Sequence, residues 1–379
     1  MAKIAIDATP ISRTGKGLSR FLVGLLGAVA DYMPQHTWIV FVNARNDHPT
    51  LPDASHIRYV SVRPRNSIQW DAIQCSLELK RHNVDLLFSC SDRLPLLHRK
   101  PMLLYLFEHP RHRHELQRPR AAWYARASMR FTDLLFPLSV KRSKRIGASS
   151  RATHDDLSSR FSLTSARIDV IYPGREEEFQ PAEDPIQQRS TRARLKSPDG
   201  YILHFSSVSD PRDNTAVALR AYHQSRSRHP HNLKLVVAGS ADPAKQGLSE
   251  VISVLGIEND IIWAGFIPES ELADTYRYAT IYLDTSLYEG FGYQVIEAMA
   301  CGTPVVCSNV TSLPEVVGDA AITTAPDDVE GFSAAIARIL SEPDLAWSMR
   351  ERGLKQVEMF SWASFCASLQ QSINRALCE

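Results

Sequence analysis

Short apolar runs that are typical of strands alternate with longer amphipathic runs that are typical of helices, and this alternation restricts the fold more than any other feature. In the first half, the predicted strands include 3–8, 37–43, 84–89 and 102–107, and a further strand is predicted at 133–139. Strands that are separated by helices pair in parallel, because no hairpin can join them, and the helices cover both faces of the sheet. The pattern therefore predicts an α/β fold with parallel sheets.

The alternation stops once and then restarts. The stretch 175–200 is polar and has no apolar periodicity, which is typical of a linker. Beyond it, predicted strands such as 201–208 and 281–286 again alternate with helices. The chain has 379 residues, and a single domain usually has roughly 100–200. We therefore predict two Rossmann-like domains, 1–178 and 179–360.

The charge of the chain is divided unequally between these halves. Through Arg175 the chain has 27 Lys and Arg against 14 Asp and Glu, a net charge of +13, whereas the remainder has 16 against 28, a net charge of −12. The basic half lacks any nucleic-acid-binding motif, so we expect no nucleic-acid partner. Docking to an anionic membrane surface and a merely solvated basic face both remain open as interpretations.

Nothing near the start resembles a secretory leader, since 1–10 leads directly into a predicted strand. The apolar run 21–30 is about half as long as a bilayer-spanning helix needs to be, so we interpret it as a core helix. The six cysteines are scattered and form no C-x-x-C pair, which is typical of a reducing compartment. We therefore expect a cytoplasmic protein, either free or peripheral on the inner face of the membrane.

The segment 289–309, EGFGYQVIEAMACGTPVVCSN, reads as a glycine turn, a helix and a strand. Gly290 and Gly292 allow the backbone to approach a ligand closely, and the helix N-terminus that follows suits a phosphate. Glu297 lies in an otherwise apolar helix, where a charge is costly unless it is hydrogen-bonded. A vicinal diol such as a ribose would satisfy it, and pairing with an arginine or a helix N-terminus is the alternative.

The longer segment 286–321 resembles the retaining GT-B glycosyltransferases of family 4. Their motif has two glutamates separated by seven residues, E-G-F-G-x-x-x-x-E-A-M-A-x-G-x-P-V-V, followed by an L-P-E-V-x-G-D turn, and this sequence matches nearly every position. The similarity extends to the glycines before the first helix, to IDVIYPGREEEFQP at the linker and to FSWASF near the end. It covers nearly the whole chain.

The resemblance implies two facing Rossmann-like domains with a cleft between them. The first would bind the acceptor and the second a nucleotide-sugar donor, while a last helix at about 361–379 would return to the first domain. It also implies that Glu297 binds the ribose and that Glu289 binds the transferred sugar. The backbone that would line the sugar and the diphosphate belongs to Gly290, Phe291, Gly292 and Tyr293.

Three further groups of residues are candidates through the same resemblance. Arg212 and Asn214 occupy the place where the family usually has a basic pair against the diphosphate; Asp213 stands where a lysine is common and is expected to point away. His109 follows a strand at whose end the family often has a histidine near the donor sugar, with Phe107 the alternative in another register. Gly15, Lys16 and Gly17 form a glycine loop before a helix, where a phosphate contact is expected. The alternative is a simple turn between a strand and a helix.

We therefore expect a retaining hexosyltransferase with Glu289, His109 and Arg212 as its catalytic residues. The donor would be a nucleoside-diphosphate sugar, and the acceptor a hydroxyl of a saccharide or lipid-linked saccharide. The opening of the chain is similar to enzymes of bacterial polysaccharide assembly and favours GDP-mannose, with UDP- and dTDP-hexoses still open. No metal is expected, because the three histidines after 107 follow a strand and lack the HExxH spacing of a helix. No cofactor is expected, since the nucleotide sugar is a co-substrate. The alternatives are a nucleotide-sugar epimerase and a non-catalytic scaffold that binds the nucleotide sugar.

Overall fold

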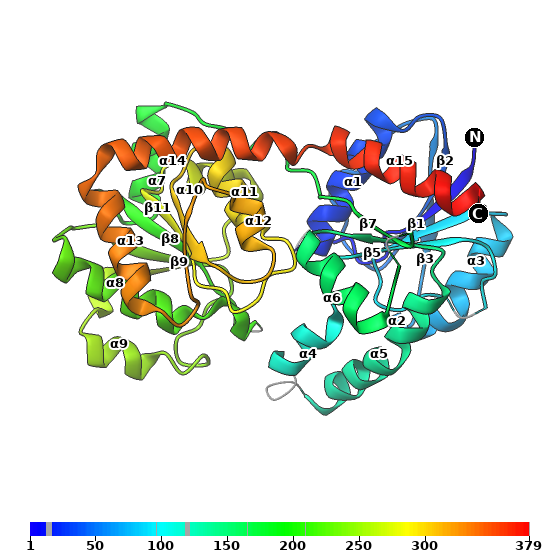
Figure 1. Cartoon of the computed structure of the whole chain (residues 1–379), viewed down its shortest axis with the longest axis horizontal. Coiled ribbons are helices and arrows are strands. Elements are labelled where there is room, and N and C mark those ends of the chain that lie inside the picture. The colour runs from blue at the N-terminus through cyan, green and yellow to red at the C-terminus, as the bar shows by residue number, and fades with distance from the viewer. Residues whose placement is uncertain (13–16, 96, 118–121, 165, 209, 379) are drawn as a thin grey trace. The chain divides into compact units, whose positions relative to one another are not determined.

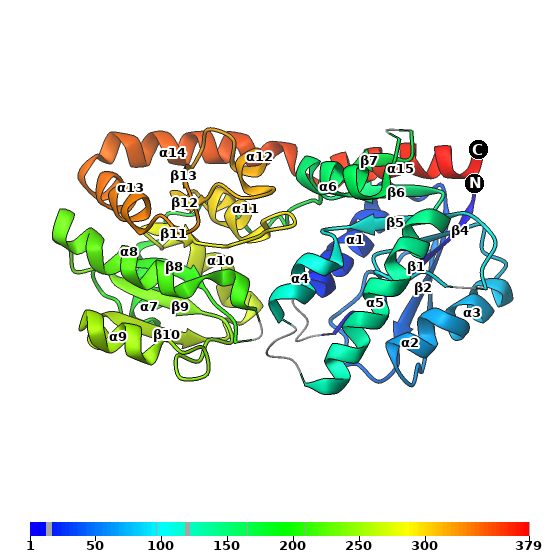
Figure 2. The ribbon, with the colours of Figure 1, turned by 60° about the horizontal axis from the view of Figure 1, so that its bottom comes forward.

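The computed structural model describes residues 1–12, 17–95, 97–117, 122–164, 166–208 and 210–378. They form two compact units (Figures 1 and 2). Unit 1 comprises Met1–Arg175 and Phe360–Glu379, and unit 2 comprises Glu176–Met359. The predicted boundaries at 178 and 360 lie close to these points.

Unit 1 contains a seven-stranded sheet in the order β3-β2-β1-β4-β5-β6-β7, in which every neighbouring pair is parallel. Its strands are β1 Lys3–Asp7, β2 Thr37–Asn43, β3 Ile57–Val62, β4 Leu86–Ser89, β5 Met102–Leu106, β6 Arg145–Ala148 and β7 Ile168–Val170. Its helices are α1 Leu18–Tyr32, α2 Ser67–Gln69, α3 Cys75–Arg81, α4 Pro110–Gln117, α5 Trp123–Arg142, α6 Arg151–Phe161 and α15 Trp362–Cys378, and a π-helical turn, Trp70–Gln74, joins α2 to α3.

Unit 2 contains a six-stranded parallel sheet in the order β10-β9-β8-β11-β12-β13. Its strands are β8 Tyr201–Phe205, β9 Lys234–Ala238, β10 Ile261–Gly265, β11 Ile281–Asp284, β12 Val305–Ser308 and β13 Ile322–Thr324. Its helices are α7 Pro185–Arg194, α8 Thr215–Arg228, α9 Ser249–Leu255, α10 Glu269–Arg277, α11 Tyr293–Ala300, α12 Leu313–Val317, α13 Val329–Ser341 and α14 Pro343–Gln356, with short 3₁₀ turns at Pro211–Asp213, Glu258–Asp260 and Val357–Met359. The prediction of two parallel α/β domains is confirmed.

The sequence also determines where several of these helices begin. Ser150 accepts a hydrogen bond from the Thr153 N–H at the start of α6, over 3.0 Å. Asp184 accepts from two backbone N–H groups at the start of α7, and Asp328 accepts from the Gly331 N–H at the start of α13, over 2.9 Å. Such side-chain caps satisfy donors that have no partner within the helix and fix its first turn.

The last helix, α15, belongs to unit 1 and lies beside α1 (Figure 1). The Phe365 ring contacts Phe21 edge-on at 5.7 Å between ring centres and Tyr105 at 5.6 Å. Near its end, the Asp169 carboxylate at β7 accepts a hydrogen bond from the Arg375 guanidinium over 2.7 Å. Aromatic packing along the helix and an ion pair near its end therefore hold α15 on the unit 1 sheet.

One predicted strand is wrong. Residues 133–139 belong to α5, which runs without interruption from Trp123 to Arg142 despite Pro137 in its interior. The side chains that α5 buries are Thr132, Phe136, Ser139 and Val140, which are spaced by three or four residues along one face of a helix. The strand of this region, β6, begins only at Arg145.

Candidate functional site

Each sheet has one crossover point, where the strand order reverses, and ligands of such folds bind beyond the carboxyl ends of the strands there. In unit 2 this point lies between β8 and β11. The loops after these two strands are tied together, since the Leu287 N–H donates to the Arg212 carbonyl oxygen over 2.8 Å. The Thr285 hydroxyl donates to the carbonyl oxygens of Asp213 and Asn214 over 2.9 and 3.1 Å. The structure thus brings the 212–214 and 289–293 candidates of the sequence to one end of one sheet.

The turn into α11 requires a glycine. Gly292 has a φ of 96°, in the left-handed region. A Cβ at this position would lie 2.7 Å from Cδ2 of Leu313, which is closer than a Cβ normally approaches another carbon atom. No side chain caps this helix start, and the N-terminus of a helix is the positive end of its dipole. This is the kind of backbone that binds a phosphate group.

Glu289 lies in the loop just before this turn and is half-buried. Its backbone is fixed to the loop after β12, because its N–H donates to the Thr311 hydroxyl over 3.0 Å and its carbonyl accepts from the Ser312 hydroxyl over 2.9 Å. The carboxylate accepts a hydrogen bond from the Ser286 hydroxyl over 3.3 Å. A loop carboxylate that is held in this way is positioned before any ligand arrives.

Glu297 lies inside α11 and is only 2% exposed. Its neighbours along the helix, Ile296 and Ala298, are also buried. Both glutamates lie close enough to the buried hydroxyl of Tyr282 to affect its ionisation. Burial, and then the charges of Asp284, Glu289 and Glu297 among its neighbours, raise the pKa of Tyr282 far above its usual range. The two carboxylates of the motif therefore influence the same part of unit 2.

Arg212 has a partner that the sequence analysis missed. Its Nε donates to Oδ1 of Asp210 over 2.9 Å and its Nη2 donates to Oδ2 over 2.7 Å, so the pair is bidentate. Asp210 also caps the 3₁₀ turn by accepting from the Arg212 N–H. The signal was present in the sequence, because an aspartate before a proline commonly begins such a turn. Asp210 orients the guanidinium and partly compensates its charge.

The two residues after Arg212 are also held within unit 2. The Asp213 carboxyl accepts a hydrogen bond from the Ser207 N–H over 2.5 Å. Burial, and to a smaller extent the charge of Asp210, raise the pKa of Asp213 to about 8. Asn214 has a left-handed backbone at the start of α8, and its Nδ2 donates to the Pro326 carbonyl over 2.7 Å. Asn214 therefore joins this loop to the region before α13.

His109 belongs to unit 1, where it follows β5 at the start of α4 and is 9% exposed. Its ring stacks on Phe161 at 5.7 Å and meets Phe136 edge-on at 4.8 Å, and its Nδ1 accepts from the Arg111 N–H over 3.1 Å. Burial, and next the charge of Arg160, lower the pKa of His109 to about 4. The ring is therefore neutral at neutral pH and lies in an aromatic cluster.

The other histidines of this stretch have separate partners, since His112 pairs with Asp156 and His114 with Asp133. Within the described ranges, no group of three or more His, Cys, Asp or Glu could hold a metal ion. Across the same residues, no helix combines the length and the apolar character that crossing a membrane demands.

Of the glycine loop before α1, Gly15 and Lys16 lie outside the described residues. Gly17 is the residue before α1, with a φ of 37°, and a Cβ there would meet nothing within 4 Å.

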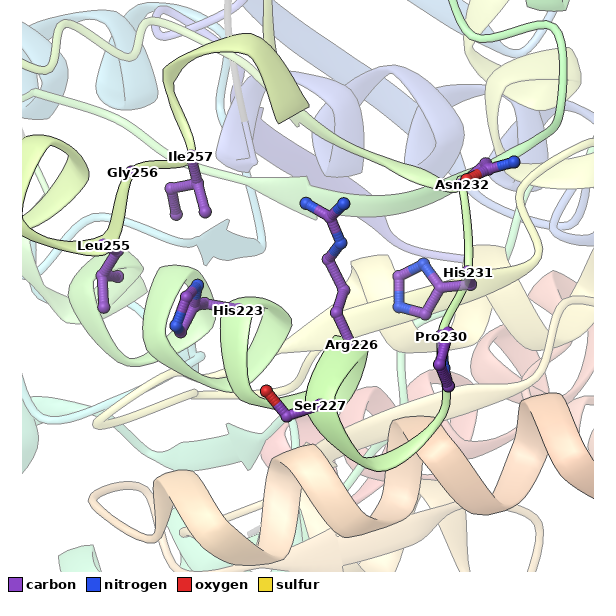
Figure 3. A pocket seen from close by; sticks show the side chains of 9 residues that line it. All are labelled: His223, Arg226, Ser227, Pro230, His231, Asn232, Leu255, Gly256 and Ile257. Atoms are coloured by element: carbon purple, nitrogen blue, oxygen red, sulfur yellow. The ribbon is translucent and has the colours of Figure 1, made fainter.

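Unit 2 also has a pocket of about 470 Å³, which lies away from the loops after β8 and β11 (Figure 3). Its lining residues come from the second half of α8 and from the segments just before β9 and β10, so it lies at the amino ends of these strands, opposite the loops described above. The guanidinium of Arg226, which points toward its centre, pairs with Asp260. Burial, and next Arg226, lower the pKa of His231 to about 4. We therefore place the candidate site at the β8–β11 crossover and not in this pocket.

Comparison with protein families identifies most of unit 2. Residues 187–356 match the family model "Glycosyl transferases group 1". Over 179 residues the chain is 38% identical to the O-antigen chain mannosyltransferase B of Escherichia coli. This match covers 46% of this chain and 45% of that relative. The chain thus matches about half the length of this curated relative.

Solved structures resemble the whole chain. Sucrose-phosphate synthase (tll1590) from Thermosynechococcus elongatus has a TM-score of 0.76 and 18% identity, with 100% of both chains covered. Anabaena Alr3699/HepE in complex with UDP and glucose has a TM-score of 0.74 and 17% identity, with 99% of this chain and 100% of that chain covered. The chain therefore has the GT-B fold, and residues 187–356, which make up most of its second unit, match the Glycosyl transferases group 1 model.

Proposed function

We propose that the protein is a retaining glycosyltransferase that moves a hexose from a nucleoside-diphosphate sugar to a hydroxyl group of a saccharide or lipid-linked saccharide. The observation that carries the proposal is the β8–β11 crossover of a Glycosyl transferases group 1 domain, where the glutamate motif and the 212–214 loop are tied together. In this proposal Glu297 binds the ribose, the start of α11 binds the diphosphate, and Glu289 binds the transferred sugar.

In this reaction the protein's main task is to stabilise the negative charge of the departing diphosphate, more than to supply a nucleophile of its own. The bond from the anomeric carbon to the diphosphate oxygen breaks, and a bond to the acceptor oxygen forms on the same face of the sugar. The acceptor proton passes to an oxygen of the departing diphosphate. Backbone N–H groups at the start of α11 and the guanidinium of Arg212, which Asp210 holds in place, would stabilise the negative charge.

We propose GDP-mannose as the donor. The support is the relative in Escherichia coli, which is a mannosyltransferase. A structure of similar fold binds UDP and glucose, so the base and the sugar need a direct test. Calorimetric titration of the protein with GDP, UDP and dTDP separates the bases, and the tightest binding is expected for GDP. Tighter binding of UDP would contradict the choice of donor and leave the reaction class intact.

Product analysis separates the proposed reaction from its two alternatives. Incubation with the bound nucleotide sugar and an oligosaccharide acceptor should give a new glycosidic linkage, and proton NMR should show that it keeps the anomeric configuration of the donor. An epimerase would convert the nucleotide sugar without an acceptor. A scaffold would bind it and leave it unchanged. A linkage of inverted configuration would refute the retaining mechanism.

We also propose that unit 1 docks on an anionic membrane that carries the acceptor, and that α5 makes the contact. Its exposed apolar side chains include Trp123, which is 78% exposed, and Leu134, which is 71% exposed. Arg130 and Lys141 are exposed on the same helix, and the intervals of seven, four and seven residues along 123, 130, 134 and 141 place them on one stripe with these side chains. Apolar side chains with interspersed cations are typical of a helix that lies in a membrane interface.

A further inference from the structure

A buried histidine lies inside the sheet of unit 2, next to the proposed donor site. His204 belongs to β8, follows the buried Leu203 and is only 2% exposed. Strands inside a parallel sheet carry mainly apolar side chains, since a buried polar group is costly unless it is hydrogen-bonded. The imidazole has two partners. Its Nδ1 lies 3.0 Å from the Leu283 carbonyl oxygen of β11, and its Nε2 lies 3.2 Å from the Thr215 hydroxyl oxygen at the start of α8.

These two partners determine which ring nitrogen carries the proton. A carbonyl oxygen can only accept, so Nδ1 of His204 donates to Leu283. Burial lowers the pKa of His204 below its usual range, and the ring is therefore neutral at neutral pH. A neutral imidazole has one donor and one acceptor, so Nε2 accepts and the Thr215 hydroxyl donates to it. The hydroxyl proton of Thr215 is thereby committed to His204.

The direction of this bond sets the direction of the next ones. The hydroxyl oxygens of Ser206 and Thr215 lie 2.7 Å apart, and by geometry alone either group could donate. Because Thr215 donates to His204, Ser206 must donate to Thr215. The side-chain amide of Gln246 donates to the Ser206 oxygen over 2.9 Å, and its own oxygen accepts from the Asp242 N–H over 2.9 Å. Each of the two hydroxyl groups therefore donates once and accepts at least once.

This network closes the base of the loop that carries Arg212. The polypeptide leaves β8 at Ser206 and enters α8 at Thr215, so the bond between the two hydroxyl groups joins the ends of the loop. Ser206 is 2% exposed and Thr215 is 4% exposed, and hydrogen bonds in such a water-poor environment are stronger than those at a surface. Within the loop, Asp210 holds the Arg212 guanidinium. The placement of the guanidinium therefore depends on a network that His204 orients.

We propose that His204 is a positioning residue for the donor, which acts through Thr215 and Ser206 to hold the loop so that Arg212 faces the diphosphate. The inference rests on the proposed function, which supplies the diphosphate. His204 itself binds no ligand in this scheme, since both of its ring nitrogens are occupied inside the sheet. The test must therefore break the network while leaving Arg212 in the sequence.

The test replaces Thr215 by valine, which keeps the shape of the side chain and removes both hydrogen bonds of its hydroxyl group. Calorimetric titration with GDP and with guanosine separates the diphosphate from the base and the ribose. Thr215→Val should weaken GDP binding about tenfold or more and leave guanosine binding unchanged, because the charged hydrogen bond from Arg212 to the diphosphate is lost. Thr215→Ser keeps the hydroxyl group and should bind GDP as the wild-type chain does.

A matched control separates positioning from stability alone. Ser225 lies on the same helix, is fully buried and donates to the Tyr222 carbonyl oxygen over 2.8 Å. Ser225→Ala also removes a buried hydrogen bond, so it should lower the melting temperature without changing GDP binding. In a double-mutant cycle, Thr215→Val should have no further effect on GDP binding once Arg212→Ala is present, because the network acts through that arginine.

The tautomer of His204 can be measured without any ligand. Proton–nitrogen correlation NMR of the imidazoles, in which the signals of His204 are those missing from His204→Gln, should show the Nδ1–H form. The Nε2–H form, or a charged ring at neutral pH, would overturn the network. Should Thr215→Val not fold, as its melting curve would reveal, Ser206→Ala breaks the same pair of hydroxyl groups and gives the same comparison.

The outcomes keep this inference apart from the proposed function. If UDP or dTDP binds in place of GDP, the same comparison is made with that nucleotide and its nucleoside. If no nucleoside diphosphate binds the wild-type chain, the proposed function fails and the positioning role fails with it. If a nucleoside diphosphate binds and the folded variants lose it no more than they lose the nucleoside, only the positioning role is wrong.

Discussion

At the scale of single residues, Glu289 and Glu297 differ in burial although they belong to one motif. Because the proposed contact of Glu297 is with the ribose, Glu297→Gln should weaken the binding of both the nucleotide sugar and the free nucleoside diphosphate. Glu289→Gln should spare the free nucleoside diphosphate and lower turnover. Each lost contact costs about 1.5–3 kcal/mol, or roughly 10- to 150-fold. Calorimetry with both ligands and initial rates measure these effects.

The controls for this pair follow from its burial. Glutamine keeps the shape of glutamate, so Glu289→Gln, at a half-buried position, should change the melting temperature little. For Glu297→Gln the melting curve must be recorded before the binding measurements, because Glu297 is only 2% exposed. Equal losses of nucleoside diphosphate affinity in the two variants would show that the proposed division between ribose and sugar is wrong. No change in either variant would make the pair structural.

Asp213 makes the stability of unit 2 depend on pH. Its folded pKa is raised to about 8 from a usual value near 3.8, so folding favours the protonated carboxyl. This contribution to stability is complete below the unfolded pKa and is lost as the pH rises through about 8. Asp213→Asn, which keeps an acceptor for the Ser207 N–H, should therefore raise the melting temperature more at pH 8 than at pH 5. An equal shift at both values would contradict the raised pKa.

The sequence could predict which residues of the site are near one another in the chain, but not the partners that fix them. The glutamate motif, Gly292 and the 212–214 loop were all predicted, because each lies after a strand in a recognisable pattern. The bidentate partner of Arg212 and the packing of His109 on Phe161 were not, since they depend on side-chain directions and on contacts across more than one element. Such contacts leave no periodic signal in one sequence.

At the scale of elements, the prediction of strands was good for those in the sheet centres and failed at 133–139. The run DLLFPLS is short, apolar and contains a proline, and such a run cannot be distinguished from part of a helix by periodicity alone. The structure makes it helical because Phe136 and Val140 face the core while Leu134 and Leu138 face outward. A strand of unit 1 buried on both sides would not leave two leucines exposed.

The exposed leucines of α5 allow the proposed membrane contact to be tested. Leu134→Gln should reduce sedimentation with anionic vesicles about tenfold or more, because a leucine that enters the acyl boundary contributes roughly 1.5–3 kcal/mol. Binding should also weaken as salt rises, since the Debye length falls from about 10 Å at 0.1 M to roughly 3 Å at 1 M.

The matched control for α5 is Leu77→Gln. Leu77 is 58% exposed on another helix of unit 1, α3, and its replacement should leave vesicle binding unchanged. Equal binding to neutral and anionic vesicles would contradict the role of the basic residues. Equal losses in both leucine variants would show that α5 is not the contact.

At the scale of the whole molecule, α15 makes the end of the chain part of unit 1. Phe365→Ala removes a ring that is 1% exposed and packs on Phe21 and Tyr105, so it should destabilise unit 1 by about 3–5 kcal/mol. Leu377→Ala on the same helix changes a side chain that is 37% exposed and should cost far less. Scanning calorimetry with and without the bound nucleotide distinguishes the units, because the ligand should raise only the transition of unit 2. A loss confined to the ligand-sensitive transition would contradict this assignment.

The return of α15 also sets the order in which a newly made chain can complete its parts. Residues 176–359 contain the whole of unit 2, so this unit has all its strands and its core once that segment has left the ribosome. Most of unit 1 is translated before unit 2, yet unit 1 lacks α15 until Trp362–Cys378 has been translated. Until then the aromatic surface that α15 covers, including Phe21 and Tyr105, stays uncovered on the nascent chain. Exposed apolar surface of this kind makes a partly folded chain prone to aggregate and a target for chaperones. Of these two units, the one whose synthesis begins earlier is therefore completed later.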